Sequence, residues 1–379
     1  MPDDPYRAAI GRSRSELETP ALLLDLDIAR RNIAVMAGHM ERAGKSLRPH
    51  TKTHKAPQIA RLQVDAGAIG VSTATAWEAI VMIDAGVDDI LVANEVVGPS
   101  RIRALAEVAR DGRVTVAVDS AANLDDLSAA AVAAGSVIGV LVEVDVGMNR
   151  GGVRSKEEAL DVARHAVSLP GIEWRGAMGY EGHCMLEPDR ALRIEKCRAA
   201  NDMLLEVVDA YGEHGHSTDI VAAGGLGTWD ITGANPRITE IHAGSYIFSD
   251  AFHRNLAPGF DPALTILTTV ISRHGNVAIL DCGRKSIGID RTLPEVVSGE
   301  GAIMYAHGEH FIHEEHTALE LDAGSHLQVG DRVELMPGYS PTTVNYYDIY
   351  HVVRDDIVVD VWPVLGRYGS ATAGVGPVR

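Results

Sequence analysis

The chain has 379 residues, more than one hydrophobic core usually supports, so we expect a large domain and a smaller second one. Its formal net charge of -18 argues against a nucleic-acid partner, and no segment holds the ~18 uninterrupted apolar residues that a membrane span requires. The three cysteines, Cys184, Cys197 and Cys282, form no CxxC pair, and the first residues show no basic and apolar leader. We therefore expect a cytoplasmic protein with reduced thiols.

Apolar runs alternate with helical patterns from Pro20 to about Phe248, as repeated βα units should. The predicted strands are residues 21–26, 47–50, 70–73, 89–93, 113–118, 138–144, 174–180, 219–223 and 237–242. The predicted helices are residues 29–43, 76–85, 100–109, 121–134, 156–168 and 189–212. About eight such units favour an α/β fold, a TIM-type (β/α)8 barrel over residues 20–255, rather than an open doubly wound sheet.

After Asp250 the pattern changes to runs rich in Val, Ile and Thr with short turns between them. The predicted strands here are residues 263–273, 277–281, 332–335, 348–354 and 357–364. We therefore expect a C-terminal, mainly β domain over residues 256–379.

Lys52 lies in the segment from Arg48 to Lys55, directly after the predicted strand 47–50. Barrel enzymes keep their chemistry at the carboxyl ends of their strands. Burial at such a place lowers the pKa of a lysine and makes its amine a nucleophile for a carbonyl group. A solvated basic helix start is the alternative interpretation, and Lys55 is the alternative lysine. The strand-end position of Lys52 favours aldehyde chemistry.

The string R-P-H-x-K-x-H-K around Lys52 resembles the cofactor-lysine motif of the D-threonine aldolase and D-serine dehydratase family. Further strings of that family follow in the same order over most of the chain. They are T-P-A-L-L-L-D from Thr19, N-E-V-V-G-P from Asn94, V-E-V-D-V-G from Val142, R-G-G from Arg150, E-I-H-A-G-S-Y from Glu240 and T-V-N from Thr343.

This resemblance implies a fold-type III pyridoxal 5'-phosphate (PLP) enzyme with an alanine racemase-like barrel. It implies that Lys52 binds PLP covalently, with His50 of the same motif at the cofactor. The N-terminal segment, about residues 1–19, packs with the C-terminal domain in relatives. Because the pocket of such enzymes is completed across a dimer interface, the resemblance also implies a homodimer that acts on a small-molecule amino acid.

A glycine-rich segment follows the predicted strand 219–223. Its glycines let the backbone approach a ligand, and successive N–H groups can form a nest that binds a phosphate. A tight strand-to-helix turn is the alternative interpretation. The resemblance places the cofactor phosphate here and a second part of the cradle further on. The predicted phosphate residues are Gly224, Gly225, Gly227 and Thr228, followed by Gly244, Ser245 and Tyr246.

Arg150 and Tyr180 are predicted at the cofactor's ring. In relatives the arginine of the Arg150 motif lies near the pyridine nitrogen, where an always-protonated guanidinium would limit the ring as an electron sink. A salt bridge with Asp145 is the alternative. Tyr180 matches the family and Glu181 departs from its Tyr-His-Gly string, while a buried core tyrosine is the alternative for Tyr180. His183 can serve as an acid or base.

The C-terminal motif departs from the metal-dependent relatives, which carry a histidine and, two residues later, an Asp or Cys before the Thr-Val-Asn string. Tyr339 and Pro341 occupy these positions here, and proline has no side-chain donor for a metal. We therefore expect no metal site of the family's kind. Residues 313–316, His-Glu-Glu-His, are a conceivable alternative cluster, although a solvated turn is the simpler interpretation.

The predicted function is a PLP-dependent lyase that cleaves a β-hydroxy-α-amino acid, D at Cα, to glycine and an aldehyde. Lys52 would then move protons at Cα, and Tyr339 would serve as the hydroxyl acid or base, with His183, Glu181 or Asn345 as neighbours. A racemase, dehydratase or hydroxymethyltransferase with the same cofactor is one alternative. A non-catalytic PLP carrier is another.

Overall fold

The computed structural model describes residues 5–299, 301–305 and 311–367, which form two compact units. The barrel unit comprises Met36–Gly244 and residues 365–367, and the β unit comprises residues 5–35 and Ser245–Val364. The division falls within helix α1, Leu26–Ala43. The predicted boundaries, 20–255 for the barrel and 256–379 with about 1–19 for the β domain, differ from this division at residues 20–35, 245–255 and 365–367. No helix in the described part of the chain is both long and apolar enough to cross a bilayer.

The barrel unit contains eight parallel strands in the order β2-β9-β8-β7-β6-β5-β4-β3. They are β2 Ser46–Leu47, β3 Val71–Thr73, β4 Asp89–Glu95, β5 Arg113–Val118, β6 Ile138–Glu143, β7 Ile172–Met178, β8 Ile220–Ala223 and β9 Glu240–Ile241. A parallel bridge between His50 and Ser72 joins the two ends of this order, and the Ser72 N–H donates to the Pro49 carbonyl at 2.9 Å. The predicted TIM-type barrel is confirmed.

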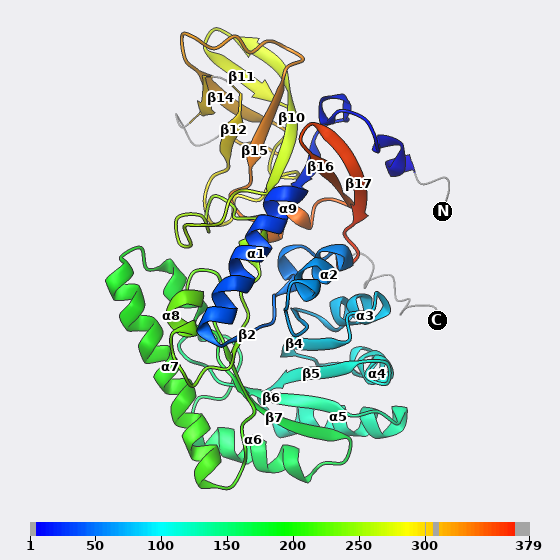
Figure 1. Cartoon of the computed structure of the whole chain (residues 1–379), viewed down its shortest axis with the longest axis vertical. Helices are drawn as coiled ribbons and strands as arrows, with labels where there is room; N and C mark the ends of the chain where they lie inside the picture. Colours follow the sequence, from blue (N-terminus) through cyan, green and yellow to red (C-terminus); the bar gives the residue numbers. More distant parts are fainter. Residues whose placement is uncertain (1–4, 300, 306–310, 368–379) are drawn as a thin grey trace. The chain divides into compact units, whose positions relative to one another are not determined.

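Helices follow the barrel strands and cover the outside of the sheet. They are α2 Pro57–Asp65, α3 Ala76–Asp84, α4 Pro99–Val108, α5 Ala121–Ala134, α6 Lys156–Ser168, α7 Arg190–Glu213 and α8 Trp229–Gly233. Figure 1 shows α3, α4 and α5 stacked along one side of β4, β5 and β6. Local signals set their ends: Ser155 accepts a hydrogen bond from the Glu158 N–H at the start of α6, and Gly135 ends α5 with φ of 66°.

The β unit is a mainly antiparallel sheet in the order β13-β14-β11-β10-β1-β16-β17, with β15 also paired to β10 and β12 paired to β15. Its elements are β1 Ala21–Asp25, β10 Leu264–His274, β11 Val277–Leu280, β12 Glu295–Ser298, β13 Ala302–Met304, β14 Thr317–Leu321, β15 Arg332–Met336, β16 Ile349–Arg354, β17 Ile357–Pro363 and helix α9 Ser340–Val344. The predicted mainly β C-terminal domain is confirmed.

Strand β1 corrects one expectation from the sequence. Residues 21–26 were expected to form the first barrel strand, and this prediction was wrong. Leu22 of β1 lies opposite Ile266 of β10, and Leu23 lies opposite His351 of β16. A run of four buried apolar residues suits the middle of either kind of sheet, so its pattern alone cannot assign it to one.

Candidate active site

Lys52 lies in a short 3-10 turn, η3 Thr51–Thr53, which follows strand β2 and the isolated bridge residue His50. The Lys52 backbone N–H donates to the His50 Nδ1 at 3.3 Å, which fixes the turn against the strand end. Within the described residues the Lys52 amine forms no ion pair. Burial, followed by the positive charge of Arg150, lowers the pKa of Lys52 to about 8. Roughly one such amine in ten is therefore neutral at pH 7.

The neighbouring Lys55 has a different environment. Its ammonium pairs with the carboxylate of Glu78, whose side chain is fully buried, and it also donates to the Gly366 carbonyl at 3.2 Å. The Thr51 hydroxyl donates to the same carboxylate at 3.2 Å. Lys55 therefore stabilises the segment that carries Lys52, and its amine is engaged rather than available to a carbonyl compound.

The side chain of Tyr180, which follows β7, lies close to both Lys52 and Arg150. The Lys52 Nζ lies 5.5 Å from the centre of the Tyr180 ring, and the Arg150 guanidinium carbon lies 5.8 Å from it. A methyl group on Gly225 would come within 3.0 Å of the same ring, so only glycine lets the loop after β8 approach it. We call Lys52, Arg150, Tyr180 and Gly225 the Lys52 cluster.

Arg150 is held by a different carboxylate from the one considered in the sequence. Its Nη2 lies 3.1 Å from the Glu143 Oε1, whereas Asp145 pairs with Arg154 at 3.5 Å. Glu143 also lies close to a second carboxyl group, that of Glu95. Burial, and then the charge of Glu143, raise the pKa of Glu95, which favours its protonated form. The guanidinium is thus anchored at the end of β6, with half of its side chain still exposed.

The loop after β8 is organised by Glu181. One oxygen of this buried carboxylate accepts from the Thr228 hydroxyl at 2.7 Å, and the other accepts from the Gly224 N–H at 3.1 Å. The Thr228 hydroxyl in turn accepts from the Gly225 N–H at 3.1 Å. Thr228 therefore shapes the loop in this structure, and its direct contact with a phosphate stays a prediction. The N–H groups of Leu226 and Gly227 form no hydrogen bond within the described residues.

His183 and His50 have contrasting surroundings. The His183 Nδ1 is buried without a hydrogen-bond partner, and its Nε2 lies 3.5 Å from the Cys184 Sγ. Burial, and then the charge of Lys52, lower the pKa of His50 well below its ordinary value, so His50 is a neutral acceptor.

Gly244 lies directly against the His50 carbonyl and leaves no room for a side chain. Ser245 and Tyr246 begin the β unit in the turn η5 Ser245–Ile247, and their cofactor roles stay predictions.

The β unit holds a second polar cluster, around Tyr339. The His253 Nδ1 lies 2.7 Å from the Asp250 Oδ1, and both side chains are buried. The His253 ring stacks on Tyr339 with centroids 5.7 Å apart, and the guanidinium carbon of Arg291 lies 5.8 Å from the Tyr339 ring centre. Burial, and then Asp250, raise the pKa of Tyr339 against the opposite effect of Arg291. We call these four residues the Tyr339 cluster.

His253 was missed in the sequence, although an aspartate three residues before a histidine is a recognisable signal. Asp250 also accepts from the N–H and the hydroxyl of Ser340, each at 2.7 Å, which ties the segment to the start of α9. Because Asp250 accepts from the Nδ1 side, the Nε2 of His253 is the nitrogen left to accept a proton. Asn345 ends α9, with its side-chain oxygen buried and unpaired.

The described residues, which include the His-Glu-Glu-His segment 313–316, contain no group of three or more His, Cys, Asp or Glu side chains placed to hold a metal ion. Within 313–316, the Glu315 carboxylate pairs with Lys285 at 2.9 Å on the surface. Pro341 lies in the first turn of α9. The absence of the family's usual metal site stays a prediction.

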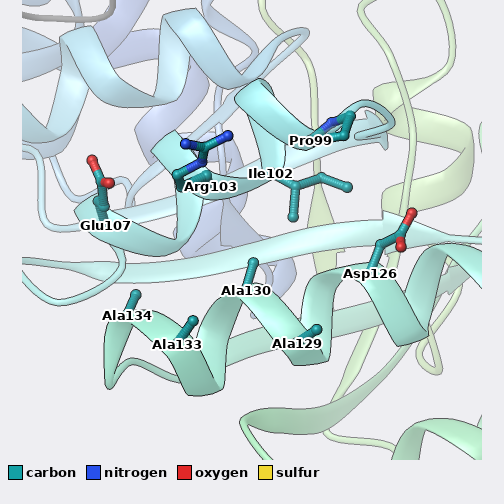
Figure 2. Close-up of a pocket in the computed structure, with 9 residues that line it drawn as sticks. All are labelled: Pro99, Ile102, Arg103, Glu107, Asp126, Ala129, Ala130, Ala133 and Ala134. Carbon is teal, nitrogen blue, oxygen red and sulfur yellow. The ribbon is translucent and has the colours of Figure 1, made fainter.

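A hollow of about 400 Å³ lies elsewhere, between α4 and α5 on the outside of the barrel. Figure 2 shows Ile102 of α4 pointing toward the alanines of α5. None of the predicted site residues lines this hollow, and it holds no nucleophile. This groove therefore contains none of the residues predicted for the site.

Comparisons with known proteins agree with this geometry. The family model "Alanine racemase, N-terminal domain" matches residues 24–249, and a serine dehydratase domain model matches residues 263–353. The chain is 35% identical to a D-threonine aldolase from Arthrobacter sp, with 96% of each protein covered. It is also 35% identical to a 3-hydroxy-D-aspartate aldolase from Paracoccus denitrificans (strain Pd 1222), with 94% of each covered.

A solved structure extends the likeness to the whole fold. The D-threonine aldolase from Filomicrobium marinum superposes with a TM-score of 0.90 at 32% identity, covering 94% of this chain and 98% of that one. The motifs around Lys52 and Arg150 predicted this relationship from the sequence, and the prediction is confirmed. The chain belongs to the alanine racemase-like family of enzymes that includes D-threonine aldolase.

Proposed function

We propose that this enzyme is a PLP-dependent lyase that cleaves a β-hydroxy-α-amino acid, of D configuration at Cα, to glycine and an aldehyde. The observation that carries the proposal is Lys52, a lysine at a barrel strand end whose pKa is lowered to about 8. An amine of this kind is suited to covalent attachment of an aldehyde at neutral pH. The 35% identity to aldolases over nearly the whole chain supports the reaction class.

The residues of the barrel unit fit the chemical groups of PLP. The amine of Lys52 suits the aldehyde, and the unpaired N–H groups of Leu226 and Gly227 suit an anionic phosphate. Arg150 is a permanent donor beside the Tyr180 ring and suits an unprotonated ring nitrogen. When bound, the cofactor would supply an electron sink that stabilises negative charge at Cα of the substrate.

The protein's own groups would then handle the protons. Loss of the proton of the β-hydroxyl allows the Cα–Cβ bond to break, so that Cβ leaves as the aldehyde carbon and Cα takes up a proton to give glycine. Lys52 is the proposed group that would move the proton at Cα. Tyr339, a phenol at the family's metal position, is the proposed group that takes the proton of the hydroxyl, and it would pass its own proton to the Nε2 of His253, whose ring stacks on it.

A substrate screen tests the reaction class. Purified enzyme with PLP is incubated with D-threonine, D-serine, D-alanine and 3-hydroxy-D-aspartate, and the products are identified by mass. Glycine with the matching aldehyde supports the lyase. Pyruvate or another oxo acid would favour a dehydratase, the L-isomer a racemase, and the absence of any turnover the non-catalytic carrier.

The same screen run with a chelator tests the metal-free proposal. Because Tyr339 and Pro341 stand at the positions of the family's metal ligands, we expect activity to change less than twofold after prolonged chelation. Strong inhibition that an added divalent cation reverses would contradict this.

We also propose that the enzyme is a cytoplasmic homodimer. Light scattering tests the dimer, which should have twice the 40.4 kDa mass of one chain.

A further inference from the structure

Glu181 is a buried carboxylate that the proposed reaction does not use. Its side chain has no exposed area, and within the described residues no lysine, arginine or histidine pairs with it. A buried carboxylate without a cation is costly unless hydrogen bonds satisfy its oxygens. Glu181 therefore has a demanding environment, which points to a specific task.

The partners of Glu181 lie in the loop proposed to bind phosphate and in the helix that follows it. In addition to Gly224 and Thr228, the Thr232 hydroxyl donates to the carboxylate at 2.5 Å, from helix α8 just beyond the loop. The Asn201 amide on α7 supports Thr232 at 3.5 Å. The carboxylate thus links the start of the loop to the helix that follows it.

The same segment also supports the middle of the loop. Glu181 precedes the turn η4, Gly182–Leu186, and Met185 of that turn would lie 2.6 Å from a methyl group placed on Gly227. The loop is therefore held at Gly224 and Thr228 by the carboxylate and packed at Gly227 by Met185. Between these supports, the N–H groups of Leu226 and Gly227 keep their hydrogen-bonding capacity for a ligand.

We propose that Glu181 is a positioning residue that holds the loop 224–228 in the shape that binds the phosphate of the cofactor, an inference that rests on the proposed function. Glu181 acts through Thr228 and the backbone and does not touch the phosphate, because two anions in contact repel each other. A carboxylate suits this task because it can accept all three hydrogen bonds at once, whereas a neutral imidazole accepts one.

The test compares two forms of the cofactor, PLP and pyridoxal, which lacks the phosphate. Both are titrated into apoenzyme of the wild type and of Glu181→Gln, and binding is followed by absorbance. The glutamine amide keeps one acceptor oxygen but presents an NH2 group where an oxygen accepted. We expect the Kd for PLP to rise about 10- to 100-fold, from the loss of hydrogen bonds to a charged group, and the Kd for pyridoxal to change less than threefold.

A matched control and a second variant make the result decisive. Glu187→Gln removes a carboxylate from the same stretch of chain, but one that pairs with Lys196 at 2.5 Å and makes no contact with the loop, so both affinities should stay unchanged. Thr228→Val removes the hydroxyl through which Glu181 acts and should raise the PLP Kd selectively, even if Glu181→Gln fails to fold.

Two outcomes overturn the inference, and they differ. If wild-type apoenzyme binds PLP much more tightly than pyridoxal and this preference persists in Glu181→Gln and Thr228→Val, the role of Glu181 is wrong and the proposed function stands. If the wild type shows no preference for the phosphorylated form, the loop is not a phosphate site, and the proposed function fails together with the inference.

Discussion

The Lys52 cluster of the barrel unit and the Tyr339 cluster of the β unit respond to burial in opposite chemical directions. Burial is the leading cause of both pKa shifts: it lowers the pKa of Lys52 to about 8 and raises the pKa of Tyr339. Because burial disfavours whichever form is charged, the lysine is more easily deprotonated and the phenol keeps its proton. At neutral pH the Lys52 amine is therefore partly neutral, whereas the Tyr339 phenol stays protonated.

The two clusters also differ in how their titratable groups are restrained. Lys52 lies in the turn η3 and its amine lies near the Tyr180 ring, but it forms no ion pair among the described residues. His253 is fixed by Asp250 at 2.7 Å and stacks on Tyr339. A group that forms and breaks a covalent bond must be free to move, whereas a group that transfers a proton benefits from a fixed position.

The largest effect is expected for Lys52→Ala. Removal of the amine should abolish covalent cofactor attachment and lower kcat at least 10³-fold, since both the attachment point and the proposed proton carrier are lost. The visible absorbance of bound cofactor and the rate of glycine formation measure the two effects. If the cofactor absorbance or the rate of glycine formation stayed at the wild-type level, the proposed role of Lys52 would be wrong.

Lys55→Met sharpens the distinction between the two neighbouring lysines. It should lower the free energy of unfolding by about 3–5 kcal/mol, because it leaves the buried Glu78 carboxylate without its cation. Urea denaturation of the apoenzyme measures this, and the cofactor absorbance should persist. Lys52→Met is the matched variant: it should lose the absorbance without a comparable loss of stability.

Tyr339→Phe separates the β-unit cluster from cofactor binding. The loss of the phenol hydroxyl should lower kcat by about 10²-fold, the usual size of a positioned acid or base, with the affinity for PLP unchanged. Tyr346→Phe, at an exposed tyrosine close by in the sequence, serves as the control and should have wild-type kcat. An unaffected kcat in Tyr339→Phe would show that another residue handles the proton of the substrate's hydroxyl.

The pH dependence tests the lowered pKa of Lys52 directly. The rate at which apoenzyme attaches pyridoxal should rise about tenfold per pH unit below pH 8 and flatten above it, because the neutral amine is the reacting form. The unfolded chain binds this proton up to about pH 10.5 and the folded chain only up to about pH 8, so wild-type apoenzyme should gain stability relative to Lys52→Met across that interval. A rate that keeps rising to pH 10 would mean an unperturbed lysine.

Regular elements of the barrel unit could be predicted closely from the sequence. The helices α5 and α6 and the strand β5 begin and end at the predicted residues, because capping residues and clear apolar periodicity mark their limits. The short elements α8, β12 and β13 went unpredicted, since three to five residues carry too little periodicity to identify an element. Strand β1 was assigned to the wrong sheet because a run of apolar residues does not indicate which sheet the strand joins.

The candidate site shows a similar limit. Lys52 and Arg150 follow predicted strands, Tyr180 ends one, and all three were predicted at one cofactor. In the structure, Lys52 and Arg150 both lie near the Tyr180 ring. The partner of Arg150 and the task of Glu181 depend on side-chain directions that no local pattern encodes. Glu181 stood out only as a departure from a motif and was considered as a neighbour of the substrate hydroxyl, whereas its oxygens bind the glycine-rich loop.

The most direct measurement is reduction of the PLP-loaded enzyme with borohydride, followed by digestion and mass spectrometry of the peptides. We expect the mass of the reduced cofactor on the peptide that contains Lys52, localised to that side chain, and on no other lysine. Attachment to Lys55 or to another lysine, or no attachment at all, would contradict the assignment of Lys52 as the residue that holds the cofactor.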